Sequence, residues 1–204
     1  RAALVRKGSL TESSRRPGTF PTVRRVLVFA SIFLCLAAVG WTSAATAGTT
    51  AANAPIRATF VGDSVAAAIS YTPAARAQLT TGLKVRLDLK VCRRLVQPSC
   101  SYQGSAPTTA LQAVQGYGRA LGSVLIVYVG YNESSSGYRQ GIDRIMRTAL
   151  AQGVTGVVWV TLRETRDLYH RTNVAIRSAA KRWPQLAVAD WHAFSAGQAW
   201  FGSD

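Results

Sequence analysis

Two uncharged, β-branched runs constrain the fold of this chain more than any other feature. They are SVLIVYVG at residues 123–130 and TGVVWVTL at residues 155–162. Neither run alternates polar with apolar residues, which is typical of a strand buried on both faces. Such strands occur in parallel sheets that helices cover on both sides.

The rest of the chain supplies the other elements of such a sheet. Five strands are predicted, over residues 57–62, 84–89, 123–130, 155–162 and 186–190. Helical patterns lie between them, over residues 64–79, 107–121, 138–153 and 169–183. Strict alternation of strand and helix implies a parallel sheet with right-handed crossovers. We therefore predict an α/β fold, a three-layer α/β/α sandwich around a five-stranded parallel sheet.

The N-terminal part is predicted to be a targeting segment. A pair of arginines precedes sixteen uncharged residues, 26–41, and ATA at residues 45–47 fits a small-x-small cleavage site. A membrane span needs about 20 apolar residues, so a cleaved signal peptide is favoured over an N-terminal membrane anchor. We expect a secreted or cell-envelope protein. The predicted division is a basic region with signal peptide or anchor over 1–47, a linker over 48–56 and a domain over 57–204.

The net charge of +15 is shared between the N-terminal 25 residues, which carry +6, and the rest of the chain, which carries +9. Residues 1–25 hold seven Lys/Arg and one acidic residue, whereas residues 26–204 hold seventeen and eight. This charge favours a general attraction to anionic surfaces, including cell-envelope polymers. No basic run is interleaved with aromatic residues, so no nucleic-acid site is expected. The sequence also contains no cofactor loop and no cluster of metal ligands, so we expect neither cofactor nor metal, and a monomer.

Cys92 and Cys100 bound the short segment CRRLVQPSC. In an exported protein, two cysteines this close are expected to form a local disulfide. The chain-entropy model gives so small a loop roughly 2–3 kcal/mol of stabilisation. A redox pair or half of a metal site is the alternative, which the lack of a nearby histidine disfavours.

Ligands bind beyond the carboxyl ends of the strands in an open parallel sheet, so the residues there form the candidate site. Ser64 follows the first strand in GDS (62–64), and Asn132 follows the third in GYN (130–132). A serine in the first turn of a helix has N–H groups and the positive end of the helix dipole beside it, which stabilise negative charge. The same pattern is also typical of an ordinary helix N-cap.

These motifs resemble those of the SGNH hydrolases, also called GDSL esterases or lipases, over about residues 59–204. Exported actinobacterial members are more closely similar, through CRRL…PSC, VVWVTLRE and DW. The resemblance implies a flavodoxin-like fold and a nucleophile, Ser64, that forms an acyl-enzyme. It assigns the oxyanion to the N–H groups of Ser64 and Gly104 and to the side chain of Asn132. Glu133 stands where the family has an aspartate.

The last motif of the family, Asp-x-x-His, is incomplete in this sequence. The chain ends in WFGSD, and if Asp204 is that aspartate, the histidine would lie three positions beyond it. The histidine is the base that deprotonates the serine, so the chain as given is expected to be nearly inactive. His192, after the fifth strand, is the candidate substitute base; its other interpretation is a surface-loop residue. His170 is expected at a helix terminus.

Other side chains near the strand ends have two interpretations each. Arg163 and Arg166 either bind an anionic group of a substrate or pair with Glu164 and Asp167. The aromatic residues after the fifth strand either pack beneath the last loop or line an acyl or sugar pocket: Trp191, Trp200 and Phe201.

Three functions are compatible with these motifs. The first is an exported serine hydrolase that cleaves a lipid, an acylated sugar or a small ester. The second is a cell-envelope binding module that has kept the fold and lost catalysis. The third is transfer of acyl groups to an envelope glycan. A histidine three positions after Asp204 would favour the enzyme over the binding module.

Overall fold

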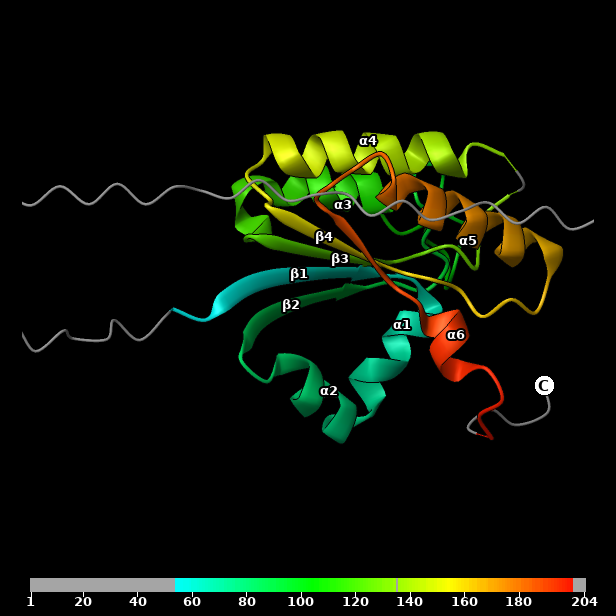
Figure 1. The fold of residues 1–204 in the computed structure, drawn as a ribbon, viewed down its shortest axis with the longest axis horizontal. Coiled ribbons are helices and arrows are strands. Elements are labelled where there is room, and N and C mark those ends of the chain that lie inside the picture. Colours follow the sequence, from blue (N-terminus) through cyan, green and yellow to red (C-terminus); the bar gives the residue numbers. More distant parts are fainter. Residues whose placement is uncertain (1–53, 135, 200–204) are drawn as a thin grey trace, which may run out of the picture. The chain divides into compact units, whose positions relative to one another are not determined.

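The structure, a computed structural model, describes residues 54–134 and 136–199 (Figure 1). The predicted targeting segment and three predicted site residues, Trp200, Phe201 and Asp204, lie outside these ranges. The strands are β1 (Ile56–Gly62), β2 (Leu83–Leu89), β3 (Val124–Tyr128), β4 (Gly156–Val160) and β5 (Leu186–Ala189). The α-helices are α1 (Ser64–Ala67), α2 (Pro73–Thr80), α3 (Ala110–Tyr117), α4 (Tyr138–Ala151), α5 (Asp167–Ala180) and α6 (Trp191–Ser195). Two 3₁₀ helices complete the described part, η1 (Ala68–Tyr71) and η2 (Gly118–Leu121).

All five strands pair in parallel, in the order β2-β1-β3-β4-β5. The chain moves outward from β1 to β2 and then returns to the other side of β1 with β3, so the strand order reverses between β1 and β3. This is the topology of flavodoxin-like folds, and their ligands bind at that reversal. The predicted α/β fold with a five-stranded parallel sheet is confirmed.

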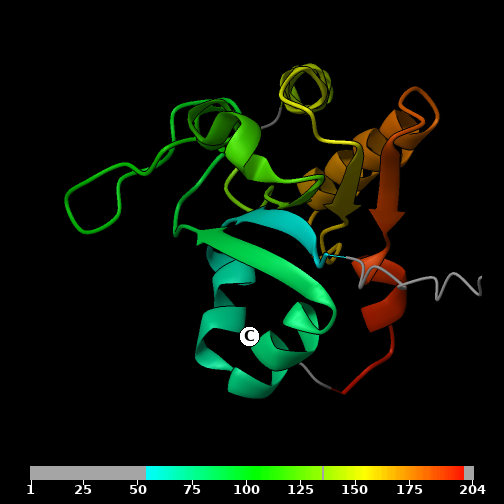
Figure 2. The ribbon, with the colours of Figure 1, turned by 90° about the vertical axis from the view of Figure 1, so that its left-hand side faces the viewer.

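Helices lie on both sides of the sheet and form the two outer layers. Helices α3, α4 and α5 lie on one side, and α1, α2 and α6 lie on the other (Figures 1 and 2). We call these sides the α4 face and the α1 face. The apolar stripe of α4 is buried, as expected for its side toward the sheet: Ile142, Ile145, Met146 and Ala149.

The predicted helix over residues 64–79 is broken into α1, η1 and α2. Pro73 begins α2 and is the cause of the break. Proline has no N–H to donate to the preceding turn, and its ring disfavours helical dihedrals in the residue before it. Thr72 accordingly adopts an extended conformation, with φ −119° and ψ 93°. The prediction of one continuous helix was wrong, and α1 has only four residues.

Strands β3 and β4 are shorter than predicted, because the residues after each strand leave the sheet and form loops at its carboxyl edge. The sequence offers Thr108 or Thr109 as the cap of α3, and the structure uses Thr109, whose Oγ1 accepts a hydrogen bond from the N–H of Gln112 at 3.1 Å. The Gln112 side chain accepts the Thr109 N–H in return at 2.9 Å. This capping box fixes the start of the helix that follows the disulfide segment.

Candidate functional site

Ser64 is the first residue of α1 and lies directly beyond β1. Its side chain is exposed, and within the described ranges its hydroxyl makes no hydrogen bond. Gly62 lets α1 approach the strand, because a Cβ on it would lie 2.4 Å from the Cβ of Ala66 and 2.7 Å from a methyl of Leu89. The hydroxyl of Ser64 is therefore presented to solvent on a tightly packed turn.

Asp63, immediately before Ser64, is completely buried and makes three hydrogen bonds to backbone N–H groups. Its Oδ1 accepts from Val65 at 3.0 Å, which caps α1. Its Oδ2 accepts from Gly130 at 3.0 Å and from Tyr131 at 3.1 Å, on the loop beyond β3. Burial raises the pKa of Asp63, while the three N–H donors counteract part of that rise. One carboxylate thus holds the loops beyond β1 and β3 together.

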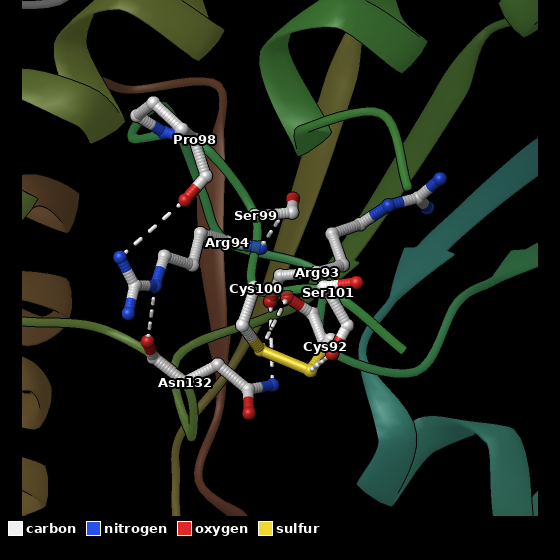
Figure 3. The surroundings of a disulfide bond; sticks show 8 residues. All are labelled: Cys92, Arg93, Arg94, Pro98, Ser99, Cys100, Ser101 and Asn132. Atoms are coloured by element: carbon white, nitrogen blue, oxygen red, sulfur yellow. Dashed lines mark hydrogen bonds between the residues drawn. A yellow bond between two sulfur atoms is a disulfide. The ribbon is translucent and has the colours of Figure 1, made fainter. Parts of the chain in front are cut away.

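Asn132 is half-buried on the loop beyond β3, beside the disulfide segment (Figure 3). Its side-chain Nδ2 donates to the backbone carbonyl oxygen of Arg93 at 3.4 Å. The backbone carbonyl oxygen of Asn132 accepts a hydrogen bond from Nε of Arg94 at 2.6 Å. The next residue, Glu133, accepts the N–H of Leu95 on the disulfide segment. Burial raises the pKa of Glu133, while the N–H of Leu95 and the charge of Arg94 counteract part of that rise. In the described part of the chain, no acceptor other than Arg93 pairs with Nδ2 of Asn132.

The predicted disulfide between Cys92 and Cys100 is present, with the two Cα atoms 5.1 Å apart. The segment starts at the same edge of the sheet as Ser64, because the N–H of Lys90 donates to the carbonyl oxygen of Gly62 at 3.1 Å. Cys92 has φ +67°, in the left-handed region that non-glycine residues rarely adopt. Among the described residues, no acceptor pairs with the backbone N–H of Cys92. This N–H is a candidate oxyanion donor that the sequence pattern did not indicate.

Arg93 is fully buried and anchors the disulfide segment. Its guanidinium donates to the side-chain and backbone oxygens of Asp88, at 3.0 Å and 2.6 Å, and to the carbonyl oxygen of Thr108 at 3.0 Å. These contacts tie the end of β2 to the residues before α3. The role of Arg93 was not predicted; the only signal was an aspartate five positions earlier, near the end of a predicted strand.

Gly104, the predicted second donor, lies at a turn closed by two backbone hydrogen bonds between Tyr102 and Ser105, of 2.8 and 3.2 Å. Residues 101–106 are exposed, and the connection between β2 and α3 projects from the body of the domain (Figure 2). A Cβ on Gly104 would meet no atom within 4 Å. The geometry therefore gives Gly104 no support as an oxyanion donor, and the prediction stays untested.

The two histidines of the described ranges both contact Glu164, on the loop beyond β4. Nδ1 of His192 accepts the backbone N–H of Glu164 at 3.2 Å, and its Nε2 lies 3.9 Å from the Glu164 carboxylate. Nδ1 of the exposed His170 lies 2.7 Å from the same carboxylate. Neither ring forms a hydrogen bond with Ser64 within the described part of the chain. This arrangement does not support His192 as the substitute base.

Glu164 is the centre of a polar cluster that joins this loop to α5. Its carboxylate accepts hydrogen bonds from Asn173 at 2.9 Å and from Arg177 at 3.3 Å. Partial burial alone would raise the pKa of Glu164, but the hydrogen bonds from Asn173, His170 and Arg177 outweigh it and lower the pKa to about 2. Arg177 also binds Asp190, with Nε 3.1 Å from its carboxylate, so the loops beyond β4 and β5 share one network.

A cavity of about 890 Å³ lies beside α1 on the α1 face of the sheet. Its lining includes residues of α1, of the loops beyond β3 and β4, and of α6: Val65, Ala66, Tyr131, Arg163 and Trp191. The backbone N–H of Arg163 donates to the hydroxyl of Tyr131 at 2.8 Å, and the guanidinium of Arg166 lies 5.8 Å from the ring centre of Tyr169. The predicted binding of an anionic group by either arginine stays a prediction.

Comparison with known proteins adds no family to this description, because neither a protein-family model nor a curated protein matches the chain. Over residues 54–134 and 136–199, no three potential metal-binding side chains cluster, and no helix has the length and apolar character to cross a bilayer. The class that the geometry defines is an α/β sandwich with its candidate site at the carboxyl edge of a parallel sheet.

Proposed function

We propose that the protein is a serine ester hydrolase with Ser64 as its nucleophile. The observation that carries the proposal is the arrangement around Asp63. This buried carboxylate precedes an exposed serine whose hydroxyl bonds to no described residue, and it binds the loop that bears Asn132. A nucleophile and a side-chain amide donor at neighbouring strand ends are what acyl transfer needs.

Three N–H groups are the proposed oxyanion donors. They are the second Nδ2 hydrogen of Asn132 and the backbone N–H groups of Ser64 and Cys92. Because α1 has only four residues, we assign the stabilisation to these individual donors and not to a helix dipole. One such donor is worth roughly 3–4 kcal/mol in a transition state. Cys92 takes the place that the family resemblance gave to Gly104, since Cys92 follows the strand next to β1.

The proposed base is a histidine three positions after Asp204, with Asp204 accepting the hydrogen bond of its second ring nitrogen. The imidazole takes the proton of Ser64 as Oγ bonds to the carbonyl carbon. It then gives that proton to the leaving alcohol oxygen as the carbon–oxygen ester bond breaks. Water hydrolyses the acyl-enzyme in the second half of the reaction, with the same histidine as its base.

The test is Ser64→Ala in protein expressed from its complete gene, assayed with p-nitrophenyl esters of graded chain length. We expect kcat/KM to fall on the order of 10³-fold or more, because the nucleophile is lost. Ser70→Ala, an exposed serine in η1, is the matched control and should retain full activity. Circular dichroism checks that both variants are folded.

Two outcomes would contradict the proposal. One is a Ser64→Ala variant that keeps a tenth or more of the parent's turnover. The other is a folded parent that hydrolyses no ester of the series and is not labelled by a serine-directed phosphonate. The second result would favour the alternative of a binding module without catalysis.

A further inference from the structure

Three cationic side chains gather near the amino ends of β1 and β2, at the edge of the sheet opposite to the candidate site (Figure 1). Arg57 pairs with Lys84, and Thr59 pairs with Arg86. Side chains of paired residues lie on the same face of a sheet, and so do those of residues two apart in one strand. All of them lie on the α4 face, because Val61, two residues after Thr59, packs with residues of α3 and α4. Arg57, Lys84 and Arg86 are therefore exposed neighbours on one face.

These side chains border a hollow of about 100 Å³. A water molecule occupies about 30 Å³ in the liquid, so the hollow has room for about three of them. Pockets for drug-sized molecules are several times larger. The buried Thr59 also lines the hollow, and its hydroxyl already donates to the carbonyl oxygen of Leu121 at 2.8 Å. The size of the hollow therefore suits a single tetrahedral oxyanion group, bound by the cations around it.

Arg86 is held in position by contacts within the domain. Its Nη1 donates to the carbonyl oxygen of Ala120 at 3.0 Å, and the centre of its guanidinium lies 4.9 Å from the ring centre of Tyr117. Within the described ranges the guanidinium makes no other hydrogen bond. Because a guanidinium has five N–H donors in a rigid plane, Arg86 can bind an anion with little further loss of side-chain freedom.

The positive charges of the cluster are not balanced by nearby carboxylates. No acidic side chain of residues 54–134 and 136–199 forms an ion pair with Arg57, Lys84 or Arg86. Asp88 lies further along the same face of β2, but its buried carboxylate binds Arg93 at 3.0 Å. Like charges at paired positions of neighbouring strands are destabilising. An anion between these side chains would remove that repulsion.

We propose that the hollow between β1 and β2 binds a phosphate group. The planar N–H fork of arginine matches two phosphate oxygens, and the lysine ammonium is a compact positive charge that also binds phosphate. A phosphate monoester carries about 1.5–2 negative charges at pH 7, which three cations accommodate better than the single charge of a carboxylate. Both strand ends contribute, since Arg57 comes from β1 and Lys84 and Arg86 come from β2.

This phosphate site is separate from the candidate active site and does not depend on the proposed function. Arg57 is five residues before Gly62 in β1, and at ~3.3 Å per residue this separates them by about 17 Å. That distance is about twice the Debye length of ~8 Å at physiological ionic strength. Substitutions in the cluster should therefore leave ester hydrolysis unchanged.

The first test measures the Tm of the full-length protein in sodium phosphate and in sodium chloride of equal ionic strength. With a Kd of about 1 mM, phosphate at about 10 mM should raise Tm by roughly 3–6 °C. Arg57→Gln/Lys84→Gln should raise Kd about 10-fold, which leaves a shift of about 1 °C. Arg76→Gln/Arg171→Gln removes the same charge from exposed positions on α2 and α5 and should respond as the parent does.

The same variants are compared in chloride alone. There Arg57→Gln/Lys84→Gln should have the Tm of the parent or a higher one, because a like-charge pair is removed. Arg57→Lys keeps the charge, so its phosphate shift should exceed that of Arg57→Gln.

Four results would overturn the inference. They are a parent without a phosphate shift, an equal shift in the two double variants, acetate that raises Tm as much as phosphate, and a clear loss of stability of Arg57→Gln/Lys84→Gln in chloride. The last result would show that the cluster has a structural role instead.

Vesicles of phosphatidylcholine with and without phosphatidic acid then distinguish the source of the phosphate group. The source is a lipid head group if the parent sediments with the phosphatidic acid vesicles, Arg57→Gln/Lys84→Gln does so several-fold less, and inorganic phosphate displaces the parent. The source is a soluble phosphate compound if the parent shows the phosphate shift and stays in solution. Vesicle binding that both double variants share is a general attraction to an anionic surface, and it also leaves a soluble compound as the source.

Discussion

Asp63 binds three backbone N–H groups from a fully buried position, and two of them lie 67 and 68 residues away along the chain. At the scale of single residues, this carboxylate decides where Ser64 lies relative to Asn132. A glutamate, Glu133, has the corresponding role toward the disulfide segment, through the N–H of Leu95. The candidate nucleophile is thus positioned by side chains that do not themselves face a substrate.

We expect Asp63→Ala to lower the free energy of unfolding by about 3 kcal/mol. The substitution removes the cap of α1 and leaves the N–H groups of Gly130 and Tyr131 without their acceptor. Asp167→Ala is the matched control, since Asp167 is an exposed carboxylate in the first turn of α5 and its loss should cost about 0.5 kcal/mol or less. Urea unfolding followed by circular dichroism measures both. Equal losses in the two variants would show that the long-range bonds of Asp63 carry no net stability.

At the scale of elements, the loop between β4 and α5 is held by the buried side chain of Leu162 and by a charged network. Glu164 contacts Asn173 and Arg177 of α5, and Arg177 continues the network to Asp190 beyond β5. This loop borders the candidate site through Arg163, whose N–H bonds to Tyr131. The stability of this side of the site should therefore depend on pH.

The pKa of Glu164 is lowered from an ordinary 4.5 to about 2 in the folded state. The stability that its ionised form contributes is therefore complete above about pH 5 and is lost as the pH falls toward 2. Glu164→Gln should lower the free energy of unfolding by about 1–2 kcal/mol at pH 7 and by almost nothing at pH 2. This value is smaller than the full pKa shift of Glu164 would give, because His170 and Arg177 are partly exposed and solvent screens their charges.

Urea unfolding at pH 7, 5, 3 and 2 measures this difference for the parent and for Glu164→Gln. The exposed Asp167→Asn is the control, and its difference from the parent should vary little with pH. A cost of Glu164→Gln that is the same at every pH would mean that the ionised cluster does not stabilise the loop.

At the scale of the whole molecule, the described ranges bring Ser64 and Asn132 to neighbouring strand ends of one parallel sheet. In our proposal the base for Ser64 lies after Asp204. The reactivity of Ser64 should therefore depend on residues other than those of the described ranges.

We expect the 204-residue chain to react with a serine-directed phosphonate about 10²–10⁴-fold more slowly than protein from the complete gene, which is the contribution of general-base catalysis. Ser64, Cys92 and Asn132 are identical in the two proteins, so only the proton acceptor differs. Mass spectrometry of intact protein follows the labelling. If the 204-residue chain is labelled equally fast and His192→Ala abolishes that labelling, the base is His192, and the assignment of Asp204 is wrong.

The local patterns of the sequence predicted most elements of the fold, but neither the break after η1 nor α6. The five strands and the apolar stripe of α4 follow from side-chain periodicity, and the cap of α3 was narrowed to Thr108 or Thr109. The disulfide was predictable for the same reason, because its cysteines are close in the chain. Pro73 was an equally local signal, and the break that it causes between η1 and α2 could have been predicted from it.

The tertiary structure alone decided which strand-end residues meet. Asp63 reaches Gly130, and Asn132 reaches Arg93, across separations of 67 and 39 residues, and no periodicity encodes a contact between two loops. The same reason explains why Cys92 was not considered as a donor from the sequence: only the fold places it directly beyond β2, whereas the prediction for Gly104 stays untested. The sequence by itself determined that both faces of β3 and β4 are apolar. Only the assembled layers reveal that, within the described ranges, side chains on the α4 face are more deeply buried than those on the α1 face, because coverage depends on where each crossover packs.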